Sequence, residues 1–133
     1  MTSDANVKTV QIIYEAFGRG DVPTILEHVA DDVDWGAEPD QSIAPWHGQY
    51  HGKAEVPRFF QAIGESIEVT EFSPLAFATN DTDVMAVIRF GFTVRKNGRS
   101  DTMDLHHWWR FRDGKVYFYR GTEDTAKTAA LFA

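Results

Sequence analysis

Residues 84–122 read VMAVIRFGFTVRKNGRSDTMDLHHWWRFRDGKVYFYRGT, three stretches rich in apolar residues that are separated by Asn97-Gly98 and Asp113-Gly114. Both dipeptides are typical of two-residue β-hairpin turns, because Asn, Asp and Gly accept the positive φ that such turns require. The segment therefore predicts three long antiparallel strands joined by two tight hairpins.

Two-residue turns give these strands an expected register, which follows by counting back from each turn. Arg112 opposes Lys115 across the second turn, which places His107 opposite Arg120. The same counting across the first turn places His107 opposite Ile88. Because side chains alternate along a strand, one face of the sheet should carry a defined set of residues. They are Val84, Ala86, Ile88, Phe90, Phe92, Met103, Leu105, His107, Trp109, Phe111, Val116, Phe118, Arg120 and Thr122.

His107 and Arg120 are the positions on this face that are neither apolar nor threonine. Polar groups inside an apolar wall are costly unless something pairs with them, so the two residues predict a pocket. There His107 would act as a general acid or base. Arg120 would lower the pKa of His107 and hold a carboxylate, enolate or phenolate oxygen. The alternative is that both are satisfied internally, with Asp34 or Glu38 pairing with Arg120.

Composition limits the classes of protein to which the chain can belong. Its 133 residues, 43% of them apolar, suit a single domain spanning residues 1–133. A net charge of −7 argues against a nucleic-acid surface, and the lack of cysteine excludes disulfides and thiolate metal sites. The first residues are polar, and no apolar run approaches the ~20 residues of a membrane span. We therefore expect a soluble, cytoplasmic protein that contacts neither nucleic acid nor membrane.

The rest of the chain predicts further elements around the three strands. Their order is that of an α+β domain, in which helices pack on one face of a sheet. The expected elements are a helix at 4–17, a helix capped by Asp21, a short strand at 33–35, a structured loop at 36–52, a helix at 54–66, a strand at 67–78 that Pro74 interrupts, the three long strands, and a C-terminal helix at 126–132.

Four segments resemble the SnoaL-like and ketosteroid isomerase-like branch of the nuclear transport factor 2-like superfamily, over nearly the whole chain. They are YEAFGRGD at 14–21, ADDVDW at 30–35, HGKAEVPRFF at 51–60 and WRFRDGKV at 109–116. The resemblance implies a cone-shaped, curved antiparallel sheet packed against three helices, a cystatin-like α+β roll with one deep apolar pocket. It also implies a homodimer. The superfamily includes isomerases, polyketide cyclases, dehydratases, epoxide hydrolases and plain binding modules, so the fold does not fix the activity.

Ketosteroid isomerase-like enzymes use three residues that this chain does not reproduce in place. They are a Tyr on the first helix, a general-base Asp after the first strand, and a protonated Asp on the penultimate strand. Alignment puts these positions at Ile13, at 36–37 and at His107, and the carboxylates nearest to the base position are Asp34 and Glu38. Isomerisation of a ketosteroid is therefore not expected.

The chain also departs from the SnoaL-like cyclases, in which a pocket His works beside an acid/base Asp on the last strand. His107 resembles that His, but the inward position beside it is Arg120, and Glu123 and Asp124 follow just beyond. Two functions stay open. One is cofactor-free proton transfer of the isomerase, cyclase or dehydratase type, with His107, Arg120 and Asp34 as catalytic residues. The other is a binding module in which His107 and Arg120 only anchor an acidic group.

The loop at 36–52, which contains Trp46 and Tyr50, and the apolar face of the sheet together predict the residues that contact a ligand. As a lid, the loop would bring His47 or Asp34 to the site as a second proton-transfer group; otherwise its side chains only pack the loop. Tyr14 either packs its helix against the sheet or sends its hydroxyl into the pocket. The ligand should be small, largely apolar and bear a carbonyl or carboxylate. The predicted ligand-binding residues are Trp35, His47, Tyr14, Phe60, Ile88, Phe90, Leu105 and Trp109.

No metal site or cofactor is expected from the histidines. His106 and His107 are adjacent on a strand, so they point to opposite faces and cannot share an ion. His47 and His51 are four residues apart, but they lie in a loop with Gly48 rather than on a helix.

The opposite face of the sheet alternates aromatic residues with arginines, a composition typical of protein interfaces. Such a face would leave a large apolar patch on a monomer. We therefore expect a symmetric homodimer through Trp108, Arg110, Tyr117 and Tyr119; the alternative is a solvated face. The residues assigned to this face are Asp104, His106, Trp108, Arg110, Arg112, Tyr117 and Tyr119.

Overall fold

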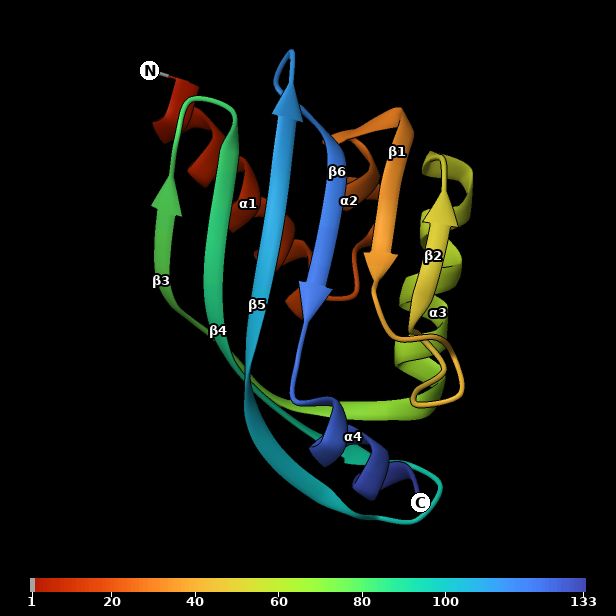
Figure 1. Cartoon of the computed structure of the whole chain (residues 1–133). Coiled ribbons are helices and arrows are strands. Elements are labelled where there is room, and N and C mark those ends of the chain that lie inside the picture. Colours follow the sequence, from red (N-terminus) through yellow and green to blue (C-terminus); the bar gives the residue numbers. More distant parts are fainter. Residues whose placement is uncertain (1) are drawn as a thin grey trace.

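The computed structural model describes residues 2–133. It shows a strongly curved sheet with helices packed behind it (Figure 1). The strands are β1 Val29–Ala37, β2 Gly48–His51, β3 Ile67–Thr79, β4 Asp83–Val94, β5 Ser100–Arg112 and β6 Lys115–Thr122, and they lie in the order β2-β1-β6-β5-β4-β3. The helices are α1 Thr2–Gly18, α2 Val22–Leu26, α3 Val56–Ser66 and α4 Thr125–Phe132, with a 3₁₀ turn at Lys53–Glu55 before α3.

The expected α+β fold, a curved sheet packed against helices, is confirmed. The sheet is mixed rather than wholly antiparallel, because β1 runs parallel to β6, with Trp35 beside Tyr119. β1 is longer than the expected short strand, and β2 forms inside the segment expected to be a loop. Within residues 2–133, no helix combines the length and the apolar character needed to cross a membrane.

The predicted helices are present, and their caps explain where two of them begin. The Asp21 carboxylate accepts a hydrogen bond from the backbone N–H of Thr24 (3.2 Å), and Asp124 accepts one from the backbone N–H of Lys127 (3.0 Å). Each carboxylate satisfies an N–H that has no partner within its helix. β3 is an edge strand with a register shift after Pro74, as the proline predicts.

The first hairpin turn is wider than predicted, which moves the register of β4 and β5 by two residues. The turn spans residues 95–99 rather than two residues, and Ala86, not Ile88, pairs with His107. The Asn97 side chain accepts from the backbone N–H of Arg99 (2.9 Å) and donates to the carbonyl of Leu131 in α4 (2.9 Å). These turn groups therefore bond within the loop and to α4. A shift of two preserves the sheet face, so the predicted inward positions of β4 and β5 are confirmed.

The second hairpin begins with the predicted turn, but its strand register then shifts. Asp113 and Gly114 have φ values of 52° and 76°, and Arg112 pairs with Lys115. One residue later a β-bulge adds Tyr117 to β6, so that Arg110 pairs with Phe118 and the register shifts by one. Because side chains alternate, a one-residue shift exchanges the two faces of the strand.

The bulge overturns the predicted pairing of His107 with Arg120. His107 pairs with Gly121, and Trp108 pairs with Arg120. Beyond the bulge, Tyr119 and Gly121 face the helices, whereas Phe118 and Arg120 face the opposite side. The predicted inward positions of Phe118 and Arg120, and the predicted outward position of Tyr119, are therefore wrong. Thr122 is exposed, at the edge of the cavity described below.

Candidate functional site

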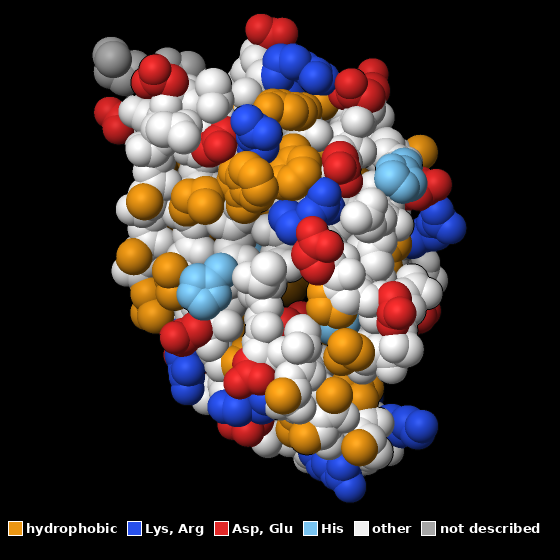
Figure 2. Space-filling model, viewed as in Figure 1, with side chains coloured by type: hydrophobic (Ala, Val, Ile, Leu, Met, Phe, Trp, Pro, Cys, Tyr) orange, Lys and Arg blue, Asp and Glu red, His pale blue; other side chains and the backbone are white. Residues whose placement is uncertain are grey.

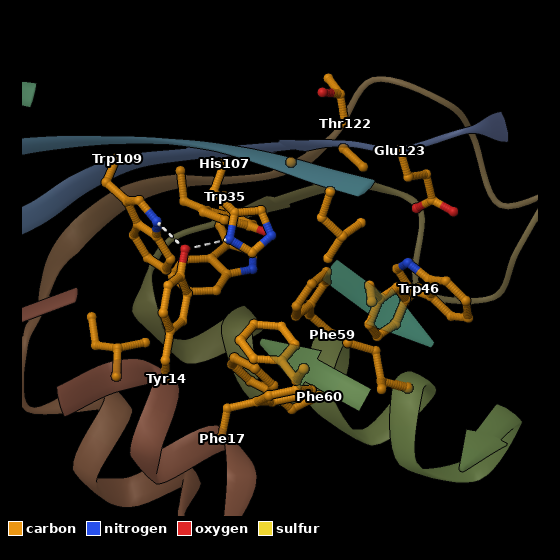
Figure 3. Close-up of a pocket in the computed structure, with 18 residues that line it drawn as sticks. Tyr14, Phe17, Trp35, Trp46, Phe59, Phe60, His107, Trp109, Thr122 and Glu123 are labelled. Carbon is orange, nitrogen blue, oxygen red and sulfur yellow. Dashed lines mark hydrogen bonds between the residues drawn. The ribbon is translucent and has the colours of Figure 1, made fainter. Parts of the chain in front are cut away.

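A cavity of about 70 Å³ lies between the sheet and helices α1 and α3 (Figure 3). Figure 2 shows a small hollow near the C-terminal end of β6, where Thr122 and Glu123 border the cavity. Most of the wall is aromatic or aliphatic, which suits an apolar ligand of few atoms. The apolar lining residues are Ile13, Phe17, Trp35, Ala37, Trp46, Phe59, Phe60, Ile63, Phe72, Phe90, Leu105 and Trp109.

A buried hydrogen-bond network joins α1 to β5 at the inner end of this cavity. The Tyr14 hydroxyl lies 2.7 Å from Nδ1 of His107, and Nε1 of Trp109 donates to the same hydroxyl at 3.1 Å (Figure 3). All three side chains are less than a tenth exposed. Tyr14 thus does both of the things left open by the sequence, because it ties α1 to the sheet and also lines the cavity.

The network indicates which nitrogen of the neutral His107 ring carries the proton. Tyr14 stays protonated, because burial raises the pKa of its hydroxyl. Trp109 can only donate to the Tyr14 oxygen, so the hydroxyl proton is free to be donated to Nδ1 of His107. The opposite tautomer would leave that hydroxyl proton without an acceptor. The neutral ring therefore carries its proton on Nε2, which bonds to no described residue and faces the cavity in Figure 3.

His107 is neutral at physiological pH. Burial, and to a lesser extent the charge of His106, lowers the pKa of His107 to about 3. The sequence predicted a lowered pKa but attributed it to Arg120, which lies on the other side of the sheet. A neutral ring with this tautomer presents a hydrogen-bond donor to the cavity, rather than acting as the general acid or base that the sequence suggested.

The β-bulge brings a second hydroxyl, that of Tyr119, to the cavity beside His107. The centres of the Tyr119 and His107 rings lie 5.1 Å apart. Burial raises the pKa of the Tyr119 hydroxyl well above its usual range. Its hydroxyl bonds to no other described residue. Gly121 makes room for it, because a Cβ at that position would lie 2.7 Å from the Tyr119 oxygen and 3.5 Å from Cδ2 of His107.

A carboxylate at the mouth of the cavity is held by two further side chains. Nε2 of His47 lies 2.8 Å from Oε1 of Glu123, and the Thr128 hydroxyl donates to Oε2. His47 is completely buried, and its Nδ1 has no partner among residues 2–133. Glu123 therefore connects the segment after β6 with the β1–β2 loop and with α4, and both of its oxygens are fixed.

Arg120 and Asp34, both predicted to be catalytic, pair with each other outside the cavity. The guanidinium bonds to both Asp34 oxygens at 3.1 and 3.3 Å, and its Nε lies 3.9 Å from Glu38. It also lies 4.5 Å from the centre of the Phe118 ring. The alternative in which Asp34 or Glu38 answers Arg120 is confirmed for the arginine, whereas His107 keeps one ring nitrogen free.

The predicted ligand-binding residues are mostly, but not all, in the cavity wall. Trp35, Tyr14, Phe60, Phe90, Leu105 and Trp109 line it, together with His107. Ile88 is buried within the core, and His47 points to Glu123 rather than into the cavity. Tyr119 and Gly121 also line the cavity, but the register expected from the sequence places them on the opposite face. Glu123 lines it as well, and the sequence indicated it only as a neighbour of Arg120.

Comparison with known proteins places the chain in a family. Residues 10–119 match the family model described as SnoaL-like domain. An NTF2-like protein of unknown function from Burkholderia pseudomallei is 32% identical, with a TM-score of 0.88 over 96% of each chain. An NTF2-like protein from Burkholderia xenovorans is 25% identical, with a TM-score of 0.89 over 100% of this chain and 99% of that one.

More distant structures share the fold. TerC, co-crystallised with polyporic acid, is 23% identical, with a TM-score of 0.86 over 96% of this chain and 97% of that one. No curated protein sequence matches the chain significantly. The family match spans most of the chain, and the similarity to the Burkholderia pseudomallei protein extends over nearly all of it. The chain therefore belongs to the SnoaL-like family of the nuclear transport factor 2-like (NTF2-like) superfamily.

Proposed function

We propose that the protein binds a small, largely apolar molecule through an acceptor oxygen that His107 and Tyr119 hold together. The observation that carries this proposal is that Nε2 of His107 and the Tyr119 hydroxyl are both unpaired within the described chain and border the same cavity. Buried polar groups are normally hydrogen-bonded, so two free donors in an apolar wall favour a ligand that completes them.

The charges around the cavity favour a carbonyl oxygen over a carboxylate. His107 is neutral, and Arg120 is paired with Asp34 on the other side of the sheet. Burying a carboxylate without a cation is far more costly than burying a carbonyl that receives two hydrogen bonds. The co-crystallisation of TerC with polyporic acid supports the idea that this fold can accommodate a small organic molecule.

A matched pair of ligands tests the acceptor oxygen. Acetophenone and α-methylstyrene have nearly the same shape, but only acetophenone carries a carbonyl. We expect acetophenone to bind at least about ten-fold more tightly, as measured by calorimetry or ligand-observed NMR, since each of the two buried hydrogen bonds to the carbonyl oxygen contributes ~1 kcal/mol.

Variants of two neighbouring histidines locate the effect. His107→Phe should reduce the preference for acetophenone about five-fold, because only Tyr119 then donates to the carbonyl oxygen, whereas His106→Phe should keep it in full, because His106 is exposed on the opposite face. Equal binding of the two ligands to the unmodified protein would contradict the proposal.

The second candidate function is catalysis of proton transfer next to a carbonyl group. Glu123 favours it, because a carboxylate with both oxygens fixed borders the cavity that contains the two donors. Its charge also contributes, after burial and Tyr14, to the raised pKa of Tyr119. Glu123 would take a proton from the carbon beside the carbonyl and return it, while His107 and Tyr119 stabilise the enolate oxygen. This assigns the base to Glu123 rather than to Asp34 or His107.

Hydrogen exchange separates catalysis from binding alone. In heavy water, a catalytic protein should accelerate the loss of the acetophenone methyl proton signal in NMR. Glu123→Gln should reduce that acceleration by about 100-fold, the range typical of a general base. Glu38→Gln is the matched control, since Glu38 is exposed and lies beside Arg120. Binding without acceleration would leave the protein a binding module.

We also propose that the protein is a homodimer joined through the outer sheet face. Trp108 packs edge-on against Phe118 with ring centres 4.9 Å apart, and Arg110 lies 5.3 Å from the centre of the Trp108 ring. Met85, which pairs with Trp108 across the strands, is 47% exposed. Figure 2 shows apolar side chains gathered over the upper part of the sheet. This composition supports a protein interface, with Phe118 in the place predicted for Tyr119.

A further inference from the structure

A third polar atom at the cavity has no partner in the described chain. Nε1 of Trp35 has less than 1 Å² of accessible surface, and no hydrogen-bond acceptor within residues 2–133 pairs with it. Trp35 itself is 1% exposed and lines the cavity. A buried N–H without a partner is destabilising, so it is uncommon in native proteins.

The indole cannot easily turn away from this position. The centre of its ring lies 4.4 Å from the centre of the Tyr119 ring. It also packs edge-on against Phe59 and Trp109, with 5.7 Å between ring centres in each case. Figure 3 shows its nitrogen on the cavity side of the ring, near the free edge of His107. The packing therefore holds the unpaired N–H close to the two donors of the proposed site.

The three free groups are all hydrogen-bond donors. An indole N–H can only donate, and His107 in its assigned tautomer donates through Nε2. The Tyr119 hydroxyl also carries a proton. One carbonyl oxygen has two lone pairs and is satisfied by two donors, so the third donor requires a second acceptor.

We infer that the natural ligand carries two acceptor oxygens on neighbouring positions, as a vicinal dicarbonyl does, and that Trp35 donates to the second oxygen. This inference rests on the proposed function, in which His107 and Tyr119 hold the first oxygen. It makes Trp35 the residue that distinguishes a diketone from a monoketone. The ligand must push neighbouring rings apart to reach Nε1, because that atom has so little accessible surface.

The direct test follows the indole N–H signals of the four tryptophans in proton–nitrogen correlation NMR spectra of the intact protein. The signals are assigned through their own side-chain connectivities, so the test does not depend on a variant that folds. The probes are acetophenone and phenylpropanedione, which adds a vicinal carbonyl. Phenylpropanedione should move the Trp35 signal in the direction of a stronger hydrogen bond, whereas acetophenone should leave it nearly unchanged.

Affinities supply the second test. Trp35→Phe should weaken the binding of phenylpropanedione about 5- to 10-fold relative to acetophenone, the effect of losing one hydrogen bond. Trp108→Phe is the matched control, because it removes an indole N–H that already bonds to Asp83 on the outer face. That variant should leave the relative affinity of the two ketones unchanged.

Failure of the Trp35 inference can be distinguished from failure of the proposed carbonyl-binding site. If both ketones bind equally and neither moves the Trp35 signal, the inference about Trp35 is overturned while the proposed function stands. If neither ketone binds, the proposed function fails, and the inference fails with it.

Discussion

At the scale of single residues, the histidine that the sequence singled out lines the cavity, but its protonation differs from the expected one. Tyr14 donates to Nδ1 and the core excludes water, so His107 stays neutral and presents an N–H to the cavity. The sequence pointed to His107 as a polar residue on an apolar face. It did not reveal the partner, because Tyr14 lies one position from where the family resemblance puts the helix tyrosine.

The depressed pKa of His107 predicts how stability depends on pH. The unfolded chain binds a proton to this ring below about pH 6.5, whereas the folded protein does so only near pH 3. The contribution of the neutral ring to the free energy of unfolding is therefore complete above pH 6.5 and is lost as the pH falls. Between pH 6 and 4 the loss should approach ~1.4 kcal/mol per pH unit.

Denaturant unfolding across this pH range, compared between the unmodified protein and His107→Phe, checks that prediction. The variant should show a correspondingly weaker decline with acid. His106→Phe should keep most of the decline, because burial, the larger cause of the lowered pKa of His107, is unchanged. A parallel decline in the protein and His107→Phe would show that the ring titrates normally.

At the scale of elements, the site depends on one inserted residue in β6. The Asp113-Gly114 turn and the pairs next to it follow from the sequence, because turn chemistry is local. The bulge at Tyr117 does not, because aromatic residues at 117–119 give no alternation that would mark which of them faces the core. The first hairpin was predictable in its faces but not in its pairing, since Asn97 bonds to α4 from a distant part of the chain.

A substitution at Gly121 tests whether the register of β6 beyond the bulge matters to the site. In Gly121→Ala the new Cβ would lie 2.7 Å from the Tyr119 hydroxyl, closer than side chains tolerate. We expect a loss of about 1–3 kcal/mol in the free energy of unfolding and weaker acetophenone binding, because the hydroxyl must move.

The double variant Gly121→Ala with Tyr119→Phe provides the control. Removing the hydroxyl relieves the closest contact, so the alanine should cost less stability in the Tyr119→Phe background than in the unmodified protein. An equal cost in both backgrounds would mean that the hydroxyl does not occupy the place that Gly121 leaves.

At the scale of the whole molecule, the two faces of the sheet carry different features. The concave face and the helices enclose the cavity, and the outer face carries the Trp108 and Phe118 pair and the Arg120–Asp34 ion pair. Element order and the family segments were enough to predict this architecture. The assignment of individual β6 residues to a face was not, because it depends on the bulge.

The proposed dimer predicts a charge-sensitive association. Trp108→Glu would place a carboxylate in the middle of the outer face, and we expect it to convert a dimer into a monomer in sedimentation velocity experiments. Lys115→Glu, at the exposed end of β6, should leave the dimer intact. If the unmodified protein sediments as a monomer at micromolar concentration, the outer face is not a dimer interface.

The protonation of the His107 ring in the free protein is the most direct test of its role as a neutral hydrogen-bond donor. Proton–nitrogen NMR correlations through the ring carbons distinguish the two tautomers and follow titration. We expect a neutral ring protonated at Nε2, with no change between pH 5 and 8, and with its proton signal moved by acetophenone. A ring protonated at Nδ1, or one that titrates with a midpoint near 6.5, would contradict it.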